Sequence, residues 1–377
     1  MELVKRLEIY KKIEDYRKRP LIVYATSTRE NVPAFMASDS VRQLIDQLDA
    51  IRESDSVDVL IHSSGGDALA AWKLMSVLRE RFKHVYVLVP FMAFSAATIF
   101  ALGADEIVMH PHASLGPIDP QITVPTPNGP RGFSYEDLGA FLRFISEEVG
   151  ISEQAYTVAL VDKIFSAVDP LQVGAAKRAS ELSTSVGERL LKMHLKESGG
   201  KDTARQIAEN LNKSFFAHGD AVSRTRAREL NLNISKDDEI LEKLMWEAYL
   251  GIESYMQLKE PFNPLHQFLA DPAGKASLEP LAPLVMPVNT PQPLIDQMWS
   301  SLAQQAISKA NGTAVQIDFL LIHAIIDSVR TASEYYSEGK ISANRTISSE
   351  VQISMLTTKG GWRCCPPTTV VPEVKAK

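Results

Sequence analysis

Apolar runs alternate with amphipathic stretches along the first third of the chain. Four runs rich in Val, Ile and Leu have the character of β-strands, at residues 20–27, 57–63, 84–90 and 106–109. The helical spacing of apolar residues fills two of the intervals between them, at residues 37–54 and 67–82. Apolar strands that alternate with helices are typical of a parallel sheet covered on both faces. The pattern predicts an α/β fold with parallel β-sheet layers and surrounding helices, in which the carboxyl ends of the strands share one edge.

One segment carries no charged side chain from Val85 to Ala104. Its length would allow it to cross a membrane, since a spanning helix needs roughly 18 apolar residues. However, "HVYVLVP" is β-branched and ends at Pro90, as a strand does, and the remainder is short and rich in small residues. We therefore predict a buried strand, turn, helix and strand here, and we do not expect membrane association.

The pattern changes beyond residue 135, where it becomes mostly helical as far as about residue 259. Residues 271–293 are rich in proline and lack periodicity, which is typical of a linker or an extended arm. After it we expect two helices between residues 297 and 339, and then one or two strands. The chain is thus divided into a main domain followed by a mainly helical C-terminal extension, with these predicted boundaries: residues 1–235 (main domain), 236–270 (helical), 271–293 (linker or arm) and 294–377 (α+β).

Composition excludes several classes of function. Apolar residues make up 45% of the 377 positions and charged residues 23%, as in an ordinary globular protein. The net charge of −6 gives no basic surface for nucleic acid. The only cysteines, Cys364 and Cys365, are adjacent and match no disulfide or zinc spacing. Because we find no metal cluster, phosphate loop or dinucleotide motif, we expect no cofactor; the charged N-terminal stretch favours a cytoplasmic location.

Two turns carry the candidate chemistry. The motif "HSSGGD" follows a strand and opens a helix, so Gly65 and Gly66 would present backbone N–H groups to a negative charge. Ser95 also follows a strand and begins a short helix, which places its hydroxyl beside the N–H of Ala96. Taken separately, the first motif is often a plain tight turn and the second an N-cap. Together they predict a serine nucleophile within an oxyanion hole.

The order of these motifs resembles a known family. "LIHSSGGD", a helix, a strand and then "FSAATIFALGADEIVMHPHASLGPID" resemble the Clp/crotonase-fold serine peptidases, and most closely the serine dehydrogenase proteinase family. The resemblance covers roughly residues 18–235. It implies that Ser95 is the nucleophile and that Gly65, Gly66 and Ala96 form the oxyanion hole. It also implies a peptide or unfolded-protein substrate, a homo-oligomer, and room for an ATP-dependent unfoldase partner.

The general base is less strongly indicated. Where ClpP has its histidine, this chain has "GPIDPQ" with Asp119. Signal peptide peptidase A uses a lysine instead, and Lys163 falls at the corresponding place, so the resemblance implies a Ser–Lys dyad. A lysine base needs its pKa lowered from about 10.4, for which we expect burial among its apolar neighbours. The alternative is a Ser–His–Asp set that uses His110 or His112 with Asp119.

Two other functions fit the same sheet. A crotonase-like acyl-CoA hydrolase or isomerase would use the amide hole without a nucleophilic serine. A non-catalytic scaffold would keep the fold and use neither the amide hole nor the serine for chemistry.

Overall fold

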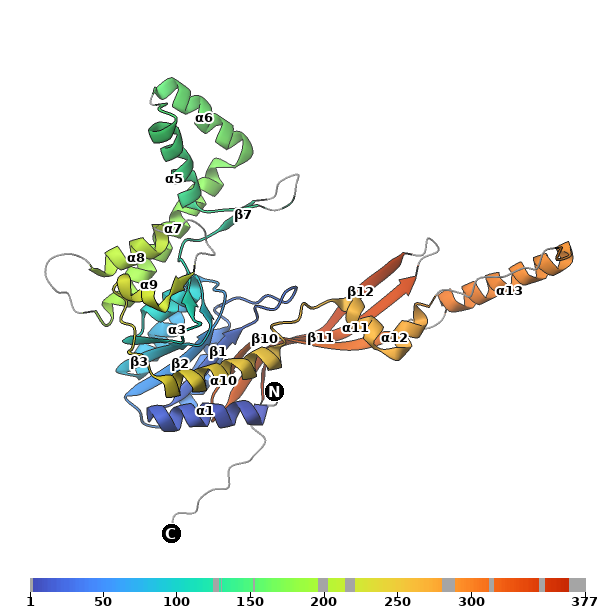
Figure 1. The fold of residues 1–377 in the computed structure, drawn as a ribbon, viewed down its shortest axis with the longest axis horizontal. Helices are drawn as coiled ribbons and strands as arrows, with labels where there is room; N and C mark the ends of the chain where they lie inside the picture. Colours follow the sequence, from blue (N-terminus) through green and yellow to red (C-terminus); the bar gives the residue numbers. More distant parts are fainter. Residues whose placement is uncertain are drawn as a thin grey trace, which may run out of the picture. The chain divides into compact units, whose positions relative to one another are not determined.

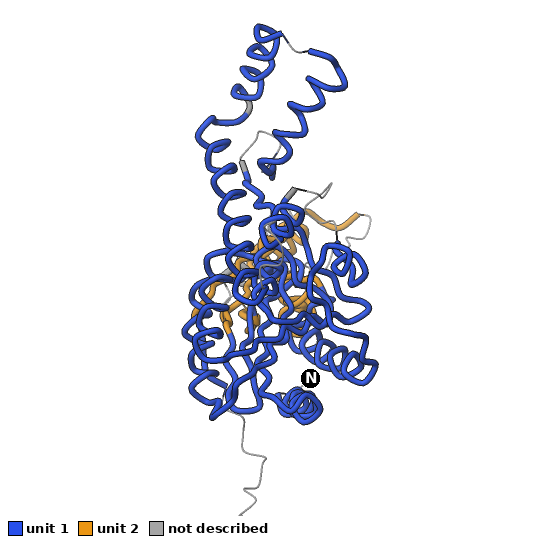
Figure 2. The backbone as a smooth tube through the Cα atoms, turned by 90° about the vertical axis from the view of Figure 1, so that its left-hand side faces the viewer, with its two compact units in different colours: residues 1–260, 323–334, 362–377 blue, residues 261–322, 335–361 orange. Residues whose placement is uncertain are grey.

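The computed structural model describes most of the chain as two compact units. Unit 1 comprises residues 1–260, 323–334 and 362–377, and unit 2 comprises residues 261–322 and 335–361 (Figure 2). Within them the described residues are 3–124, 129, 131–151, 153–195, 203–213, 221–279, 289–311, 315–345 and 350–365. The predicted division of the chain is finer than these two units and stays a prediction, and much of the predicted proline-rich arm lies outside the described residues.

Unit 1 is built on the parallel strands that the sequence predicts. In sheet order they are β1 (Leu21–Thr26), β2 (Ser56–His62), β3 (His84–Val89) and β5 (Glu106–Met109). Each pairs in parallel with the next, and nearly every residue of the first two is buried. Buried Val, Ile and Leu side chains thus form the core. The predicted α/β architecture is confirmed.

Helices connect these strands and cover the sheet. The connections run through α2 (Ser40–Ala50), α3 (Ala68–Arg81) and α4 (Ala96–Leu102). Asp67 caps α3, because its carboxylate accepts the N–H of Leu69 at 2.9 Å. All seven residues of α4 are buried, and α4 packs against α3 and against the long helix α7 (Pro170–Lys192), which also contacts α8 (Thr203–Lys213). The uncharged run is therefore a buried strand, turn, helix and strand, as predicted. In the part of the chain that the structure describes, no helix combines the length and apolar character needed to span a membrane.

The first and last parts of the chain meet in unit 1. The opposite edge of β1 pairs antiparallel with β10 (Gln316–Asp327), so that Thr26 lies beside Ala324. Helices α1 (Leu3–Arg17) and α10 (Glu239–Met256) lie side by side below this sheet (Figure 1). A buried ion pair, with 2.9 Å between Arg6 Nη2 and Asp327 Oδ2, links α1 to β10. Residues more than 300 positions apart thus share one core.

The C-terminal part differs from its prediction in one element. A helix is found as expected at α13 (Gln292–Asn311), but the prediction of a second helix is wrong. Its residues form β10 and β11 (Ala332–Arg345), followed by the expected strand β12 (Val351–Cys364). The run "QIDFLLIHAIID" is rich in β-branched residues and finds a strand partner in β1, so pairing distant in sequence decides its structure. Unit 2 also holds α11 (Pro264–Ala270) and α12 (Pro272–Ser277), and Arg345 Nε donates to Leu278 O at 3.0 Å.

A helical arm projects from unit 1 between the site segments and α7. It consists of α5 (Tyr135–Arg143), the π-helical turn η1 (Phe144–Glu148) and α6 (Gln154–Ala167). Figure 1 shows α5 and α6 at the far end of α7, away from the sheet of unit 1. The smaller elements of unit 1 are β4 (Met92–Ala93), β6 (Ser114–Leu115), β7 (Ile122–Val124), β8 (Arg131–Phe133), β9 (Val222–Ser223) and α9 (Arg224–Glu229).

Candidate active site

The two predicted turns meet where β2 and β4 end. Ser63 follows β2 and forms a parallel bridge with Ala93. Its N–H donates to Met92 O at 3.1 Å, and its carbonyl accepts from Phe94 N at 3.0 Å. The glycine turn is therefore bound through its backbone to the segment that leads into Ser95.

Gly65 packs directly against the start of α4. A Cβ atom added to Gly65 would lie 2.6 Å from Ser95 Cβ, 2.7 Å from Phe94 O and 3.2 Å from Ala96 N. The backbone φ of Gly65 is +113°, a conformation that L side chains rarely adopt. Only glycine fits at this position, and its absent side chain lets the two turns converge as the sequence analysis expected.

Ser95 has the backbone of a constrained turn. Its φ is 51° and its ψ is −118°, and its side chain makes no capping hydrogen bond to α4. The N-cap role that a serine usually has at this place is therefore absent here. The residue is half-buried. A non-glycine residue in such a conformation costs about 1–3 kcal/mol and is typical of functional sites.

The three predicted oxyanion donors are not equivalent. Gly65 N–H donates to Ser63 Oγ at 3.1 Å, so this amide already has a partner. Among the described residues no acceptor takes the N–H of Gly66 or of Ala96. The Gly65 amide is therefore paired within the turn, unlike those of Gly66 and Ala96, and the roles of all three as oxyanion donors stay a prediction.

Lys163 lies on the outer arm. Its side chain is exposed, and so are Val158 (61% exposed) and Phe165 (43%). The expected burial of this lysine among apolar neighbours is therefore wrong for the single chain, because those neighbours on α6 are themselves largely exposed in the part of the chain that the structure describes. Nothing in the described part of the chain places Lys163 beside Ser95, and its role as a base stays a prediction.

The histidines of the alternative triad belong to an aromatic cluster. The His110 ring stacks on Trp246 of α10, with 5.1 Å between centroids and 15° between planes. The His112 ring lies against the same indole, with 4.9 Å between centroids. The backbone N–H of His112 donates to His110 Nδ1 at 3.1 Å. Burial lowers the pKa of His110. Asp119 accepts a bond from Gln121 Nε2 at 3.1 Å, and the printed ring contacts of His110 and His112 are with each other and with Trp246. The triad alternative stays a prediction.

One buried group near the site has no strong sequence signal. His62 ends β2 and is fully buried, and its ring lies 5.1 Å from that of Tyr249. Burial lowers the pKa of His62 to about 4, so the imidazole is neutral at physiological pH. Its position directly before the glycine motif was the only available hint. The neutral ring packs against Phe91 and Tyr249.

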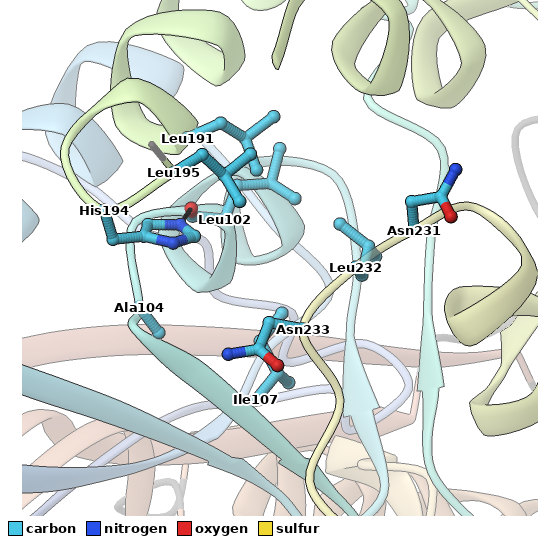
Figure 3. Close-up of a pocket in the computed structure, with 9 residues that line it drawn as sticks. All are labelled: Leu102, Ala104, Ile107, Leu191, His194, Leu195, Asn231, Leu232 and Asn233. Carbon is cyan, nitrogen blue, oxygen red and sulfur yellow. Dashed lines mark hydrogen bonds between the residues drawn. The ribbon is translucent and has the colours of Figure 1, made fainter. Parts of the chain in front are cut away.

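A small cavity lies at the opposite end of α4 from Ser95. It is lined mainly by apolar side chains of α4, α7 and the segment after α9, including Leu102, Leu191 and Leu232 (Figure 3). The His194 ring enters it and its Nε2 lies 2.9 Å from Leu102 O. Because Leu102 ends the helix that Ser95 precedes, this cavity is separate from the site. Among the residues described, no cluster of His, Cys, Asp or Glu could hold a metal ion.

The N-terminal part of the chain matches a known protein family. Residues 1–129, which include both turns, match the family described as ClpP-like SDH-type serine proteinase. The match covers about a third of the chain. The predicted fold of the Clp/crotonase type is thereby confirmed, and the family's chemistry is that of a serine proteinase.

Two relatives are similar to this chain over part of their length. The uncharacterized proteins MJ0137 and MJ1495 of Methanocaldococcus jannaschii are 24% and 26% identical over 59% and 62% of this chain. These matches cover 66% of the first relative and 72% of the second, so the chain spans slightly less than two thirds of the first.

Two solved structures have a distant likeness to this chain. The 1510-N membrane-bound stomatin-specific protease is 15% identical over 56% of this chain and 79% of its own, with a TM-score of 0.34. ClpP1 from Listeria monocytogenes is 14% identical over 61% of this chain and 98% of its own, with a TM-score of 0.30. At this level of likeness no property of either protein is transferred to this chain.

Proposed function

We propose that this protein is a serine peptidase that hydrolyses peptides or unfolded protein. Ser95 Oγ attacks the scissile carbonyl carbon and gives its proton to a general base. The N–H groups of Gly66 and Ala96 donate to the oxyanion, and the base returns the proton to the leaving amine. Water then hydrolyses the acyl-enzyme. The observation that carries the proposal is the direct packing of the glycine turn against a strained, uncapped Ser95 and the adjoining N–H of Ala96.

Lys163 is the base that we propose, acting within an assembly. Helix α6 exposes apolar side chains around this lysine, and an apolar helix in water gains stability when a second surface covers it. In a homo-oligomer, such covering would also supply the desolvation that a lysine base requires. The cytoplasmic location and an ATP-dependent unfoldase partner remain expectations of the same proposal.

A fluorophosphonate probe tests the nucleophile, because only an activated serine reacts with it. We expect the wild-type protein to be labelled on Ser95 and the Ser95→Ala variant to lose both the label and the cleavage of unfolded casein. The control is Ser76→Ala, since the Ser76 hydroxyl only donates to Trp72 O within α3. Labelling that persists in Ser95→Ala would refute the proposed nucleophile. An unlabelled protein that hydrolyses acyl-CoA would identify the crotonase-like alternative instead.

A further inference from the structure

We infer that Ser63 and Thr26 are positioning residues that hold the glycine turn in its oxyanion-binding conformation. The inference rests on the proposed function, since it concerns the same oxyanion hole. Neither residue would touch the substrate: Ser63 is 1% exposed and Thr26 is 0% exposed. Their two hydroxyls form a buried relay that ends on the glycine turn.

The relay consists of two hydrogen bonds that share one oxygen. Thr26 Oγ1 donates to Ser63 Oγ at 2.8 Å, and Gly65 N–H donates to the same oxygen at 3.1 Å. A hydroxyl oxygen has two lone pairs, so these bonds use its whole accepting capacity. The Ser63 proton points to Gly65 O at 3.4 Å. The relay therefore occupies the N–H of Gly65, so that the N–H of Gly66 is the one that the turn offers to a ligand.

Ser63 also connects the two halves of the oxyanion hole. Its backbone is bonded to Met92 and Phe94, on the strand that precedes Ser95, while its side chain holds Gly65. A change in its side chain would therefore alter the place of the Gly66 amide relative to Ser95. Oxyanion donors act only when they point at the position of the developing charge, so a small displacement lowers the rate.

The outer end of the relay rests on the C-terminal part of the chain. Thr26 is the last residue of β1 and pairs with Ala324 of β10, and Ser27 N–H donates to His323 O at 2.7 Å. On the other side of the turn, Met36 N–H donates to Gly65 O at 2.7 Å. The glycine turn is thus fixed from two directions. The relay is the only one of these supports that depends on side-chain hydroxyls.

The test measures fluorophosphonate labelling at a series of probe concentrations. Its maximal rate reports on the oxyanion hole and its half-saturating concentration on probe binding. We expect Ser63→Ala to lower the maximal rate by about 10- to 100-fold with little change in the half-saturating concentration. Thr26→Val, which keeps the shape but removes the hydroxyl, should lower the maximal rate by about 3- to 10-fold.

Thr26→Ser is the matched control. It keeps the hydroxyl and loses a buried methyl group, so its thermal unfolding midpoint should fall while its maximal labelling rate stays within about twofold of wild type. If the maximal labelling rates of Thr26→Val and Thr26→Ser simply follow their thermal unfolding midpoints, the two residues are merely structural and the inference is wrong. The comparison of these two variants also tests the inference if Ser63→Ala does not fold.

Failure of the inference is distinct from failure of the proposed function. If Ser95→Ala abolishes labelling but folded Ser63→Ala and Thr26→Val label at the wild-type rate, the peptidase stands and the relay does not. If Ser95→Ala is still labelled, the proposed function itself falls.

Discussion

The glycine turn and helix α6 are built in opposite ways, although both carry residues of the proposed mechanism. In the turn, Gly65 is packed against Ser95 and bonded on both its amide and its carbonyl. On the arm, Val158 is 61% exposed, and Leu171 at the start of α7 is 80% exposed. The glycine turn is thus supported within one chain, whereas the apolar surface around Lys163 is not covered by the elements that the structure describes. Substitutions in the turn should therefore affect stability, and those on the arm should affect activity or assembly alone.

The largest effect is expected from Gly65→Ala. The new methyl group would overlap Ser95 and Phe94, and the φ of +113° would be strained. Together these should lower the free energy of unfolding by about 3–5 kcal/mol in urea denaturation. The control is Gly361→Ala, where φ is +128° but the Cβ would meet nothing within 4 Å, so only the backbone strain remains. Equal losses in both variants would mean that the two turns are not in close contact.

Lys163→Ala should separate activity from stability. We expect the rate of casein cleavage to fall by about 100- to 10,000-fold, as for the loss of a general base. The free energy of unfolding should change by less than about 0.5 kcal/mol, because the side chain is exposed. Lys177→Ala on α7 is the matched control. If Lys163→Ala stays active while His110→Ala or His112→Ala is inactive and folded, the triad alternative is correct.

The buried His62 predicts how the stability of the turn region depends on pH. Its pKa is lowered to about 4 in the folded protein, against about 6.5 in the unfolded chain, so the unfolded state binds more protons between these values. The contribution of His62 to the free energy of unfolding should therefore rise with pH over this window, by at most about 3 kcal/mol, and be lost as pH falls through it. Asp327 contributes with the opposite sign, because burial raises its pKa to about 6. The difference between the wild-type and His62→Phe curves, in denaturant titrations at pH 4 to 7, isolates the His62 term. A difference that stays constant with pH would contradict the lowered pKa of His62.

The smallest effect is expected on the arm itself. Val158→Lys places a charge on the exposed apolar surface and should weaken self-association about tenfold, or about 1.4 kcal/mol. Light scattering across a range of protein concentrations measures this change. Gln154→Lys adds the same charge at an exposed polar position of α6 and should have little effect. If both variants associate like the wild type, α6 is not the surface that joins the copies.

The sequence was most informative where local pattern and fold agree. The strands of the parallel sheet and helix α4 were predictable because apolar runs with polar boundaries are compatible with few structures other than buried strands and helices. The convergence of Ser95 and Gly65 was predictable because both residues follow the ends of strands. The strands β10 and β11 were missed because their pairing with distant residues overrides an ambiguous pattern. The loss of the Gly65 amide to Ser63 depends on a side-chain orientation that no pattern encodes. The burial expected of Lys163 failed because apolar neighbours in sequence do not supply a packing partner in space.

The pairing of β1 with β10 has a consequence for the order of synthesis. Strand β1 leaves the ribosome well before its antiparallel neighbour β10, which follows only after some three hundred further residues have been translated. Until then Thr26 lacks the neighbour that holds it in register, and Arg6 lacks the carboxylate it meets in the finished core. A nascent chain therefore gains this support for the glycine turn only after β10 has been translated, so the proposed site cannot be fully assembled before that point.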